Sequence, residues 1–145
     1  MNVYKPVMLT GTMMAWFLGG AVSGQQNPST SILEGVFNEA QAVRGQALYY
    51  QYCLNCHGET MEGVDKAPAL AGPLFSNSWL DAPLAAVVAR ILTMPPEKPG
   101  VLTPAESVDV LTYILWYNGL PLGEQELTSD MGRLTELTFR TPATN

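Results

Sequence analysis

The two cysteines and the single histidine of this 145-residue chain lie within one five-residue segment, as Cys53, Cys56 and His57. Two thiols three residues apart can add across the two vinyl groups of one haem. The next side chain then lies beneath the iron, where the imidazole of His57 can supply a neutral nitrogen ligand. These residue types at this spacing predict one covalently bound haem c, attached through Cys53 and Cys56.

Three other kinds of site use cysteines at this spacing. A thiol–disulfide redox pair belongs beside a strand followed by a helix, and no strand pattern precedes Cys53. A zinc site wants four ligands, and the chain has no second Cys or His pair to complete one. An inert disulfide would leave His57 without a role. The haem interpretation is the one that uses all three residues.

The motif must be positioned by the elements around it. A helical pattern runs from about residue 38 to 55, with residues at steps of three and four on one face: Ala42, Gly45, Leu48, Tyr49 and Tyr52. Residues 58–78, rich in glycine and proline, predict a long loop. A loop of about 20 residues is unusual in a compact domain unless it has a function or wraps something. Residues 83–93 predict a second helix, which Met94-Pro95-Pro96 ends.

The clearest helix start in the chain lies further on. Thr103 is a predicted N-cap, Pro104 occupies the first helical position, and Glu106 completes a capping box. This third helix ends at Asn118-Gly119 and has four residues on its predicted apolar side: Val108, Leu111, Leu115 and Trp116. Residues 120–145 predict one weak helical turn at 131–137, followed by frayed chain. The sequence has no alternating strand pattern of any length.

Four features besides the motif carry a family resemblance. They are Gly45 eight residues before Cys53, Ala-Pro-Ala-Leu-Ala-Gly at 67–72, Thr-Met-Pro-Pro at 93–96, and Tyr-Ile-Leu-Trp-Tyr-Asn-Gly at 113–119. In this order they resemble class I cytochrome c over roughly residues 36–127, and more narrowly the cytochrome c components of quinoprotein dehydrogenases. The resemblance implies an all-α cytochrome c fold, with three main helices and long loops wrapped around one covalently attached haem.

Met94 is the candidate for the sixth ligand of the iron. It ends the predicted second helix, and the two prolines after it stiffen its loop and donate no backbone hydrogen bonds. Met61 is four residues from His57, a reach of at most about 14 Å, and would have to round the haem edge at once. Other methionines lie in the N-terminal segment or the tail: Met8, Met13, Met14 and Met131. Spacing alone leaves core packing open for Met94, whereas the resemblance implies that His57 and Met94 are the metal ligands.

The resemblance assigns supporting roles to five residues. Pro68 is similar to the family proline whose carbonyl accepts a hydrogen bond from the ligand histidine, with an ordinary turn proline as the alternative. Gly45 and Tyr113 are similar to the close crossing of the first and last helices. Trp79 and Arg90 could contact haem propionates, or else pack in the core and on a solvated helix face.

Ligation by His57 and Met94 would leave the iron no open position, so the expected function is electron transfer without catalysis. Such a pair also raises the reduction potential. One alternative is a haem enzyme or gas sensor with an open sixth position, and the absence of a second histidine argues against action on peroxide. Another is an obligate subunit of a dehydrogenase. Expected partners are redox proteins, with a quinoprotein dehydrogenase as donor and an oxidase or another cytochrome as acceptor.

The remaining predictions concern location and domain limits. Residues 1–24 predict a signal peptide, or an uncleaved signal-anchor, because one early lysine precedes an apolar run of about 16 residues and then small residues. This predicts a periplasmic or otherwise exported protein. Residues 25–35 form a predicted linker, 36–127 the cytochrome c domain and 128–145 a C-terminal tail. The net charge of −6 argues against nucleic acid as a partner.

Overall fold

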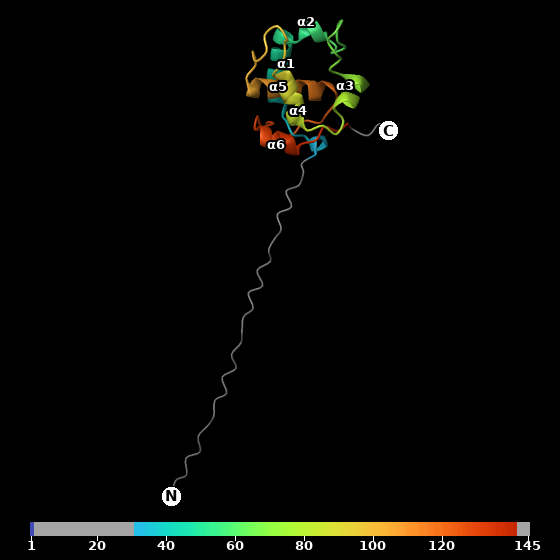
Figure 1. Ribbon diagram of the computed structural model, residues 1–145. Helices are drawn as coiled ribbons and strands as arrows, with labels where there is room; N and C mark the ends of the chain where they lie inside the picture. Colours follow the sequence, from blue (N-terminus) through green and yellow to red (C-terminus); the bar gives the residue numbers. More distant parts are fainter. Residues whose placement is uncertain (2–30, 142–145) are drawn as a thin grey trace.

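The computed structural model describes Met1 and residues 31–141 of the chain. These residues form an all-α fold, as predicted, with one short 3-10 helix and six α-helices (Figure 1). The elements are η1 (Ile32–Glu34), α1 (Glu39–Tyr52), α2 (Leu54–His57), α3 (Gly72–Trp79), α4 (Leu84–Ile91), α5 (Pro104–Tyr117) and α6 (Met131–Glu136). Among the helices so described, none combines the length and apolar character that crossing a membrane requires. The predicted export segment, residues 1–24, lies outside the described part apart from Met1.

The two longest helices, α1 and α5, pack against each other. Gly45 of α1 lies at their crossing, where a Cβ atom would collide with the backbone carbonyl of Asp109 and approach Tyr113 Cβ at 3.1 Å. The missing side chain lets the two backbones approach, as the resemblance implied for Gly45 and Tyr113. The predicted inner face of α1 is confirmed, because Ala42, Gly45 and Tyr49 are buried.

Helix α5 begins as the sequence predicts. The Thr103 hydroxyl accepts from the Glu106 N–H, and the Glu106 carboxylate accepts from the Thr103 N–H at 2.8 Å, so the capping box is complete. Leu111 and Leu115 are fully buried, as expected for the apolar side. The prediction for Trp116 was wrong: its side chain is 40% exposed. It lies on the outer side of the last turn of the helix, next to Tyr117, which is 42% exposed, whereas Leu115 in the same turn is buried.

Residues 58–78 were predicted as a loop, but they contain α3. Its sequence has Gly, Pro, Ser and Asn among few apolar residues, so no helical periodicity marks it. The contact at its start comes from far along the chain: the N–H of Gly72 donates to Asn118 Oδ1 at 2.9 Å. The Asn118 amide also donates to the Leu70 carbonyl at 2.9 Å. The end of α5 therefore holds the start of α3.

The helical turn predicted at 131–137 is confirmed as α6, whereas the chain directly after it, predicted to fray, packs on the domain as far as Phe139. Leu134 of α6 and Phe139 are fully buried. The Phe139 N–H donates to the Ala82 carbonyl at 2.8 Å, and the Leu84 N–H donates to the Leu137 carbonyl at 2.8 Å, around an isolated antiparallel bridge. At the other end, Ile32 is also fully buried. The buried core therefore extends beyond the predicted limits of 36 and 127.

Candidate functional site

The Cys53–His57 motif occupies a tight turn that continues α1. Cys53 separates α1 from α2, and its N–H donates to the Tyr49 carbonyl at 2.8 Å. The His57 N–H donates to the Cys53 carbonyl at 2.9 Å, so the motif forms about one helical turn. Cys53 is partly buried, Cys56 is exposed, and His57 is buried with 9% of its surface accessible.

The ring of His57 is held by the backbone of the following loop. His57 Nδ1 lies 2.9 Å from the carbonyl oxygen of Pro68. A carbonyl only accepts, so Nδ1 carries the proton and Nε2 keeps a free lone pair. This is the contact that the resemblance implied for Pro68. It fixes both the tautomer and the orientation of the imidazole.

The loop after α2 folds back over the motif. The Gly63 N–H donates to the His57 carbonyl at 2.9 Å, and the Val64 N–H donates to the Cys56 carbonyl at 3.0 Å. Gly63 has φ +78°, and a Cβ there would collide with the backbone around Ala67. A glycine is needed at this position for both reasons. The loop thereby brings the Pro68 carbonyl within hydrogen-bond distance of His57 Nδ1.

A cavity of about 940 Å³ opens beside the motif. It is bordered by Cys53, Cys56, His57 and Met94, the four site residues predicted from the sequence. Most of the remaining wall is apolar and comes from the loop and from α3, α4 and α5: Leu70, Phe75, Val87, Ile91, Val110 and Ile114. Sites for cofactors and small molecules usually span about 300–1,000 Å³, so this cavity has room for a large, flat, apolar group.

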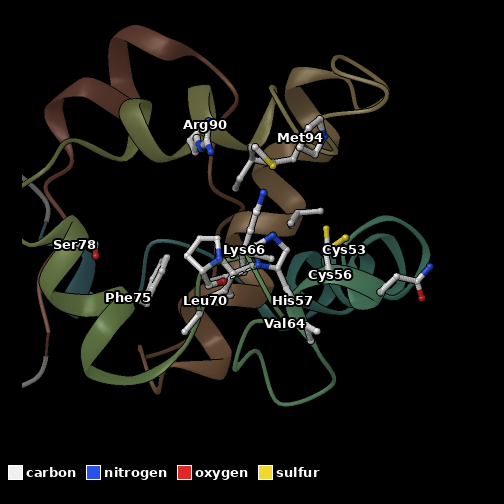
Figure 2. A pocket seen from close by; sticks show the side chains of 18 of the residues that line it. Cys53, Cys56, His57, Val64, Lys66, Leu70, Phe75, Ser78, Arg90 and Met94 are labelled. Carbon is white, nitrogen blue, oxygen red and sulfur yellow. Dashed lines mark hydrogen bonds between the residues drawn. The ribbon is translucent and has the colours of Figure 1, made fainter.

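Met94 lies across the cavity from His57. Figure 2 shows Met94 above the cavity and His57 below it, with Cys53 and Cys56 at one end. Met94 follows α4 and its N–H donates to the Ile91 carbonyl at 2.9 Å, which continues the helix geometry to this point. Of the other described methionines, Met61 is fully buried away from the cavity wall and Met131 is 40% exposed on α6.

These residues fit haem c. The cavity offers two thiols at one end, a histidine with its Nε2 lone pair available, and a thioether on the opposite wall. The apolar walls suit the porphyrin faces, and the orientation of His57 is already set by Pro68. A porphyrin with two vinyl groups at one edge matches this arrangement of donor groups.

A comparison with known protein families matches residues 40–114, just over half of the chain, to the family described as cytochrome c oxidase, cbb3-type, subunit III. The chain belongs to this family. It is a class I, monohaem c-type cytochrome, and its cofactor is haem c. Neither the curated proteins nor the solved structures compared with the cytochrome gave a match. The narrower resemblance to partners of quinoprotein dehydrogenases stays a prediction.

The thiol of Cys53 in this cytochrome is a poor redox-active group by itself. Burial, together with the adjacent Cys56 sulfur, raises the pKa of the Cys53 thiol to about 11. Thiol–disulfide catalysts lower the pKa of the attacking cysteine to about 3.5–7.5, because the thiolate is the nucleophile.

Within residues 31–141, no group of three or more His, Cys, Asp and Glu side chains is arranged to hold a metal ion.

The end of the cavity away from the thiols also carries polar groups. Arg90 and Ser78 lie on that side in Figure 2, and Trp79 also lines the cavity. The side chain of Arg90 has only a long contact to the Thr93 hydroxyl, at 3.5 Å. Sequence reasoning had left open whether Arg90 and Trp79 face the cofactor, and both border its cavity. No signal in the sequence indicated that Ser78 would line the cavity, and its hydroxyl donates to the Leu74 carbonyl at 2.7 Å.

Proposed function

We propose that this cytochrome is an exported carrier of single electrons, with haem attached through Cys53 and Cys56 and iron ligated by His57 and Met94. One observation carries the proposal: the only histidine of the chain and Met94 lie on opposite sides of one apolar cavity that both thiols border. The bound haem supplies a one-electron couple. The protein's part is to hold the cofactor, exclude water and keep both ligands in place.

Each side chain has a definite task in this arrangement. His57 presents Nε2 to the cavity, because its Nδ1 proton is engaged by the Pro68 carbonyl. This contact fixes the orientation of the imidazole. Met94 presents a soft thioether, which favours the reduced state of the iron. Because both axial positions would be filled from the protein, little rearrangement accompanies electron transfer.

The apolar wall supports a carrier over a catalyst. Phe75, Ile91 and Ile114 border the cavity and are buried. A dry, apolar setting disfavours the more highly charged oxidised state and raises the potential. The alternative function, a haem enzyme or gas sensor, requires an open iron position, which Met94 would close. An enzyme acting on peroxide would also benefit from a second histidine, and the chain contains only one histidine.

The proposed partners are redox proteins. The family description names a subunit of an oxidase, which favours an oxidase, or another cytochrome, as electron acceptor. A quinoprotein dehydrogenase is the proposed donor, on the resemblance described above. Residues 1–24 are the proposed export signal, which would place the cytochrome in the periplasm or outside the cell. Both a free carrier and a dehydrogenase subunit fit this proposal.

A reduced-minus-oxidised absorption spectrum of the haem-loaded protein tests the axial ligands. The oxidised protein should show the weak red band of methionine–iron ligation, and the reduced protein should not bind CO at neutral pH. Ready CO binding would favour the sensor or enzyme alternative. Sequencing the N-terminus of the secreted protein tests export, with cleavage near residue 24 as the expected result.

A further inference from the structure

Tyr49 hydrogen-bonds both ends of the haem-binding motif. At the N-terminal end of the motif, the backbone carbonyl of Tyr49 accepts from the Cys53 N–H at 2.8 Å, which is an ordinary helical hydrogen bond. At the C-terminal end, the Tyr49 hydroxyl donates to the carbonyl of Gly58, the residue after His57, at 2.7 Å. One residue of α1 thus holds the first cysteine by its backbone and the end of the motif by its side chain.

The ring of Tyr49 is itself immobile. Its side chain is fully buried. It packs edge-on against Tyr113 of α5, with ring centroids 5.4 Å apart, and against Tyr50 at 6.3 Å. Tyr113 is also the neighbour of Gly45 at the α1–α5 crossing. The hydroxyl therefore projects from a buried ring beside the crossing of α1 and α5.

The Gly58 carbonyl accepts two hydrogen bonds, and the one from the Tyr49 hydroxyl, at 2.7 Å, is shorter than the one from the Met61 N–H, at 3.3 Å. Gly58 has φ +79° and ends α2, so the chain turns sharply there into the loop that carries Gly63 and Pro68. A Cβ at Gly58 would collide with the Glu62 carboxylate, which shows how closely the loop is folded. Burial raises the pKa of the Tyr49 hydroxyl far above neutrality, so it remains a donor at any physiological pH.

We propose that Tyr49 is a positioning residue for the haem site: its hydroxyl fixes the peptide after His57 and so sets the orientation of the axial histidine. This rests on the proposed haem site and deepens it. The hydroxyl touches no cofactor atom and acts through Gly58 and the loop behind it. A ring that merely filled the core would need no hydroxyl.

The variant Tyr49→Phe separates the two roles, because it keeps the ring and removes the hydroxyl. The matched control is Tyr113→Phe, which removes a hydroxyl from the same aromatic cluster. In the described residues, the hydrogen bond from this cluster to the Gly58 carbonyl comes from Tyr49 and not from Tyr113. Amide hydrogen exchange is measured on the reduced, haem-loaded proteins at Gly63, whose N–H donates to the His57 carbonyl. The reduction potential of each protein is measured as the second readout.

In Tyr49→Phe the Gly63 amide should exchange about tenfold faster, because the partly buried Gly58 carbonyl loses the shorter of its two hydrogen bonds and keeps only the 3.3 Å bond from the Met61 N–H. The amide of Leu111 in α5 should stay within about twofold, because the opening is local. The potential should fall, since a looser motif admits water near the iron. Tyr113→Phe should leave both readouts unchanged.

Equal behaviour of Tyr49→Phe and Tyr113→Phe in both measurements would overturn the positioning role. That outcome is distinguishable from failure of the proposed function. If unsubstituted protein binds CO and lacks the red band, the ligand assignment fails, while the exchange rate at Gly63 still decides the role of Tyr49.

Discussion

At the level of single residues, the hydrogen bond between His57 and Pro68 does the most to define the chemistry. It is one bond of 2.9 Å in a buried setting, and it selects the tautomer that leaves Nε2 available to the iron. A neutral hydrogen bond of this kind adds only about 1 kcal/mol to stability. Its larger effect is on the proposed function, because the ring of the proposed ligand His57 is oriented before the cofactor is bound.

Met94→Ala should open the iron. The weak red band should disappear, the reduced protein should bind CO, and the potential should fall by a sizeable part of the roughly 0.8 V that axial ligands control. Absorption spectra and a redox titration measure these changes. The control is Met131→Ala, on the exposed side of α6, which should leave all three properties unchanged. If Met94→Ala retained the red band, another side chain would have to be the ligand.

At the level of elements, two polar contacts connect the segment after α5 to α1. Their burial indicates which of the two contributes more to stability. The Gln41 amide exchanges two hydrogen bonds with the backbone of Leu127, at 2.9 and 2.7 Å, and is 2% exposed. Arg44 pairs with Asp109 and Glu126, but its side chain is 48% exposed. An exposed pair typically contributes about 0–1 kcal/mol. Loss of Gln41 would leave two buried backbone groups unpaired, each costing about 1–3 kcal/mol, so Gln41 is the stronger tie.

Gly45→Ala should destabilise the crossing of α1 and α5. Alanine is normally favoured over glycine in a helix by about 1 kcal/mol, but here the added Cβ meets the Asp109 carbonyl. Because backbone must move to make room, we expect a loss of about 3 kcal/mol or more. Denaturant unfolding of the haem-loaded protein measures it.

The control for that experiment is Gly132→Ala in α6. An added Cβ there would approach only the Asp130 side chain, at 3.1 Å. Its effect should stay within about 1 kcal/mol in either direction. A Gly45→Ala protein as stable as this control would mean that the helices cross less closely than the structure shows.

At the level of the whole molecule, the haem completes the core. The cavity of about 940 Å³ lies between α2, α3, α4 and α5, so its walls would be exposed to water without the cofactor. Cys53→Ala combined with Cys56→Ala should therefore give little folded, exported protein. Far-UV circular dichroism and thermal unfolding measure this. The control is Val43→Ala with Leu122→Ala, two exposed side chains. A cooperatively folded, haem-free double cysteine variant would contradict the wrapping of the fold around haem.

Electron exchange with the partner should depend little on salt. Removal of residues 1–24 would leave six basic and thirteen acidic side chains. The charges bordering the cavity nevertheless cancel, with Asp65 and Glu97 against Lys66 and Arg90, and Lys98 follows Glu97 directly in the chain. An exposed apolar side chain also borders the cavity, since Val64 is 46% exposed. We therefore expect a small apolar docking patch and a weak, short-lived complex.

The measurement is the second-order rate of reduction by a candidate dehydrogenase across ionic strength. Charge steering changes such rates by about 10–1,000-fold, so a change below about tenfold supports the apolar patch. A steep fall with added salt would refute it. Lys98→Glu is the matched variant: it upsets the local balance by two charges and should make the rate salt-dependent.

Much of the site could be predicted from the sequence, because its signals are local. Cys53, Cys56 and His57 lie within one turn, and the capping box at Thr103 spans four residues. Met94 depended on more distant information, the family pattern around a helix end, and the structure brings it to the same cavity as the motif. Its role as ligand stays a prediction. Local spacing determines which atoms are neighbours only within a turn or two of chain.

Tertiary structure alone decided the contacts between distant segments. Helix α3 depends on Asn118, 46 residues away from Gly72. Phe139 is buried because it packs edge-on against Phe75, with ring centroids 5.6 Å apart. The helical pattern of the sequence does not determine whether the Tyr49 hydroxyl points to solvent or to the motif. In each case the stabilising partner lies outside any local window, and burial depends on which segments the folded chain brings together.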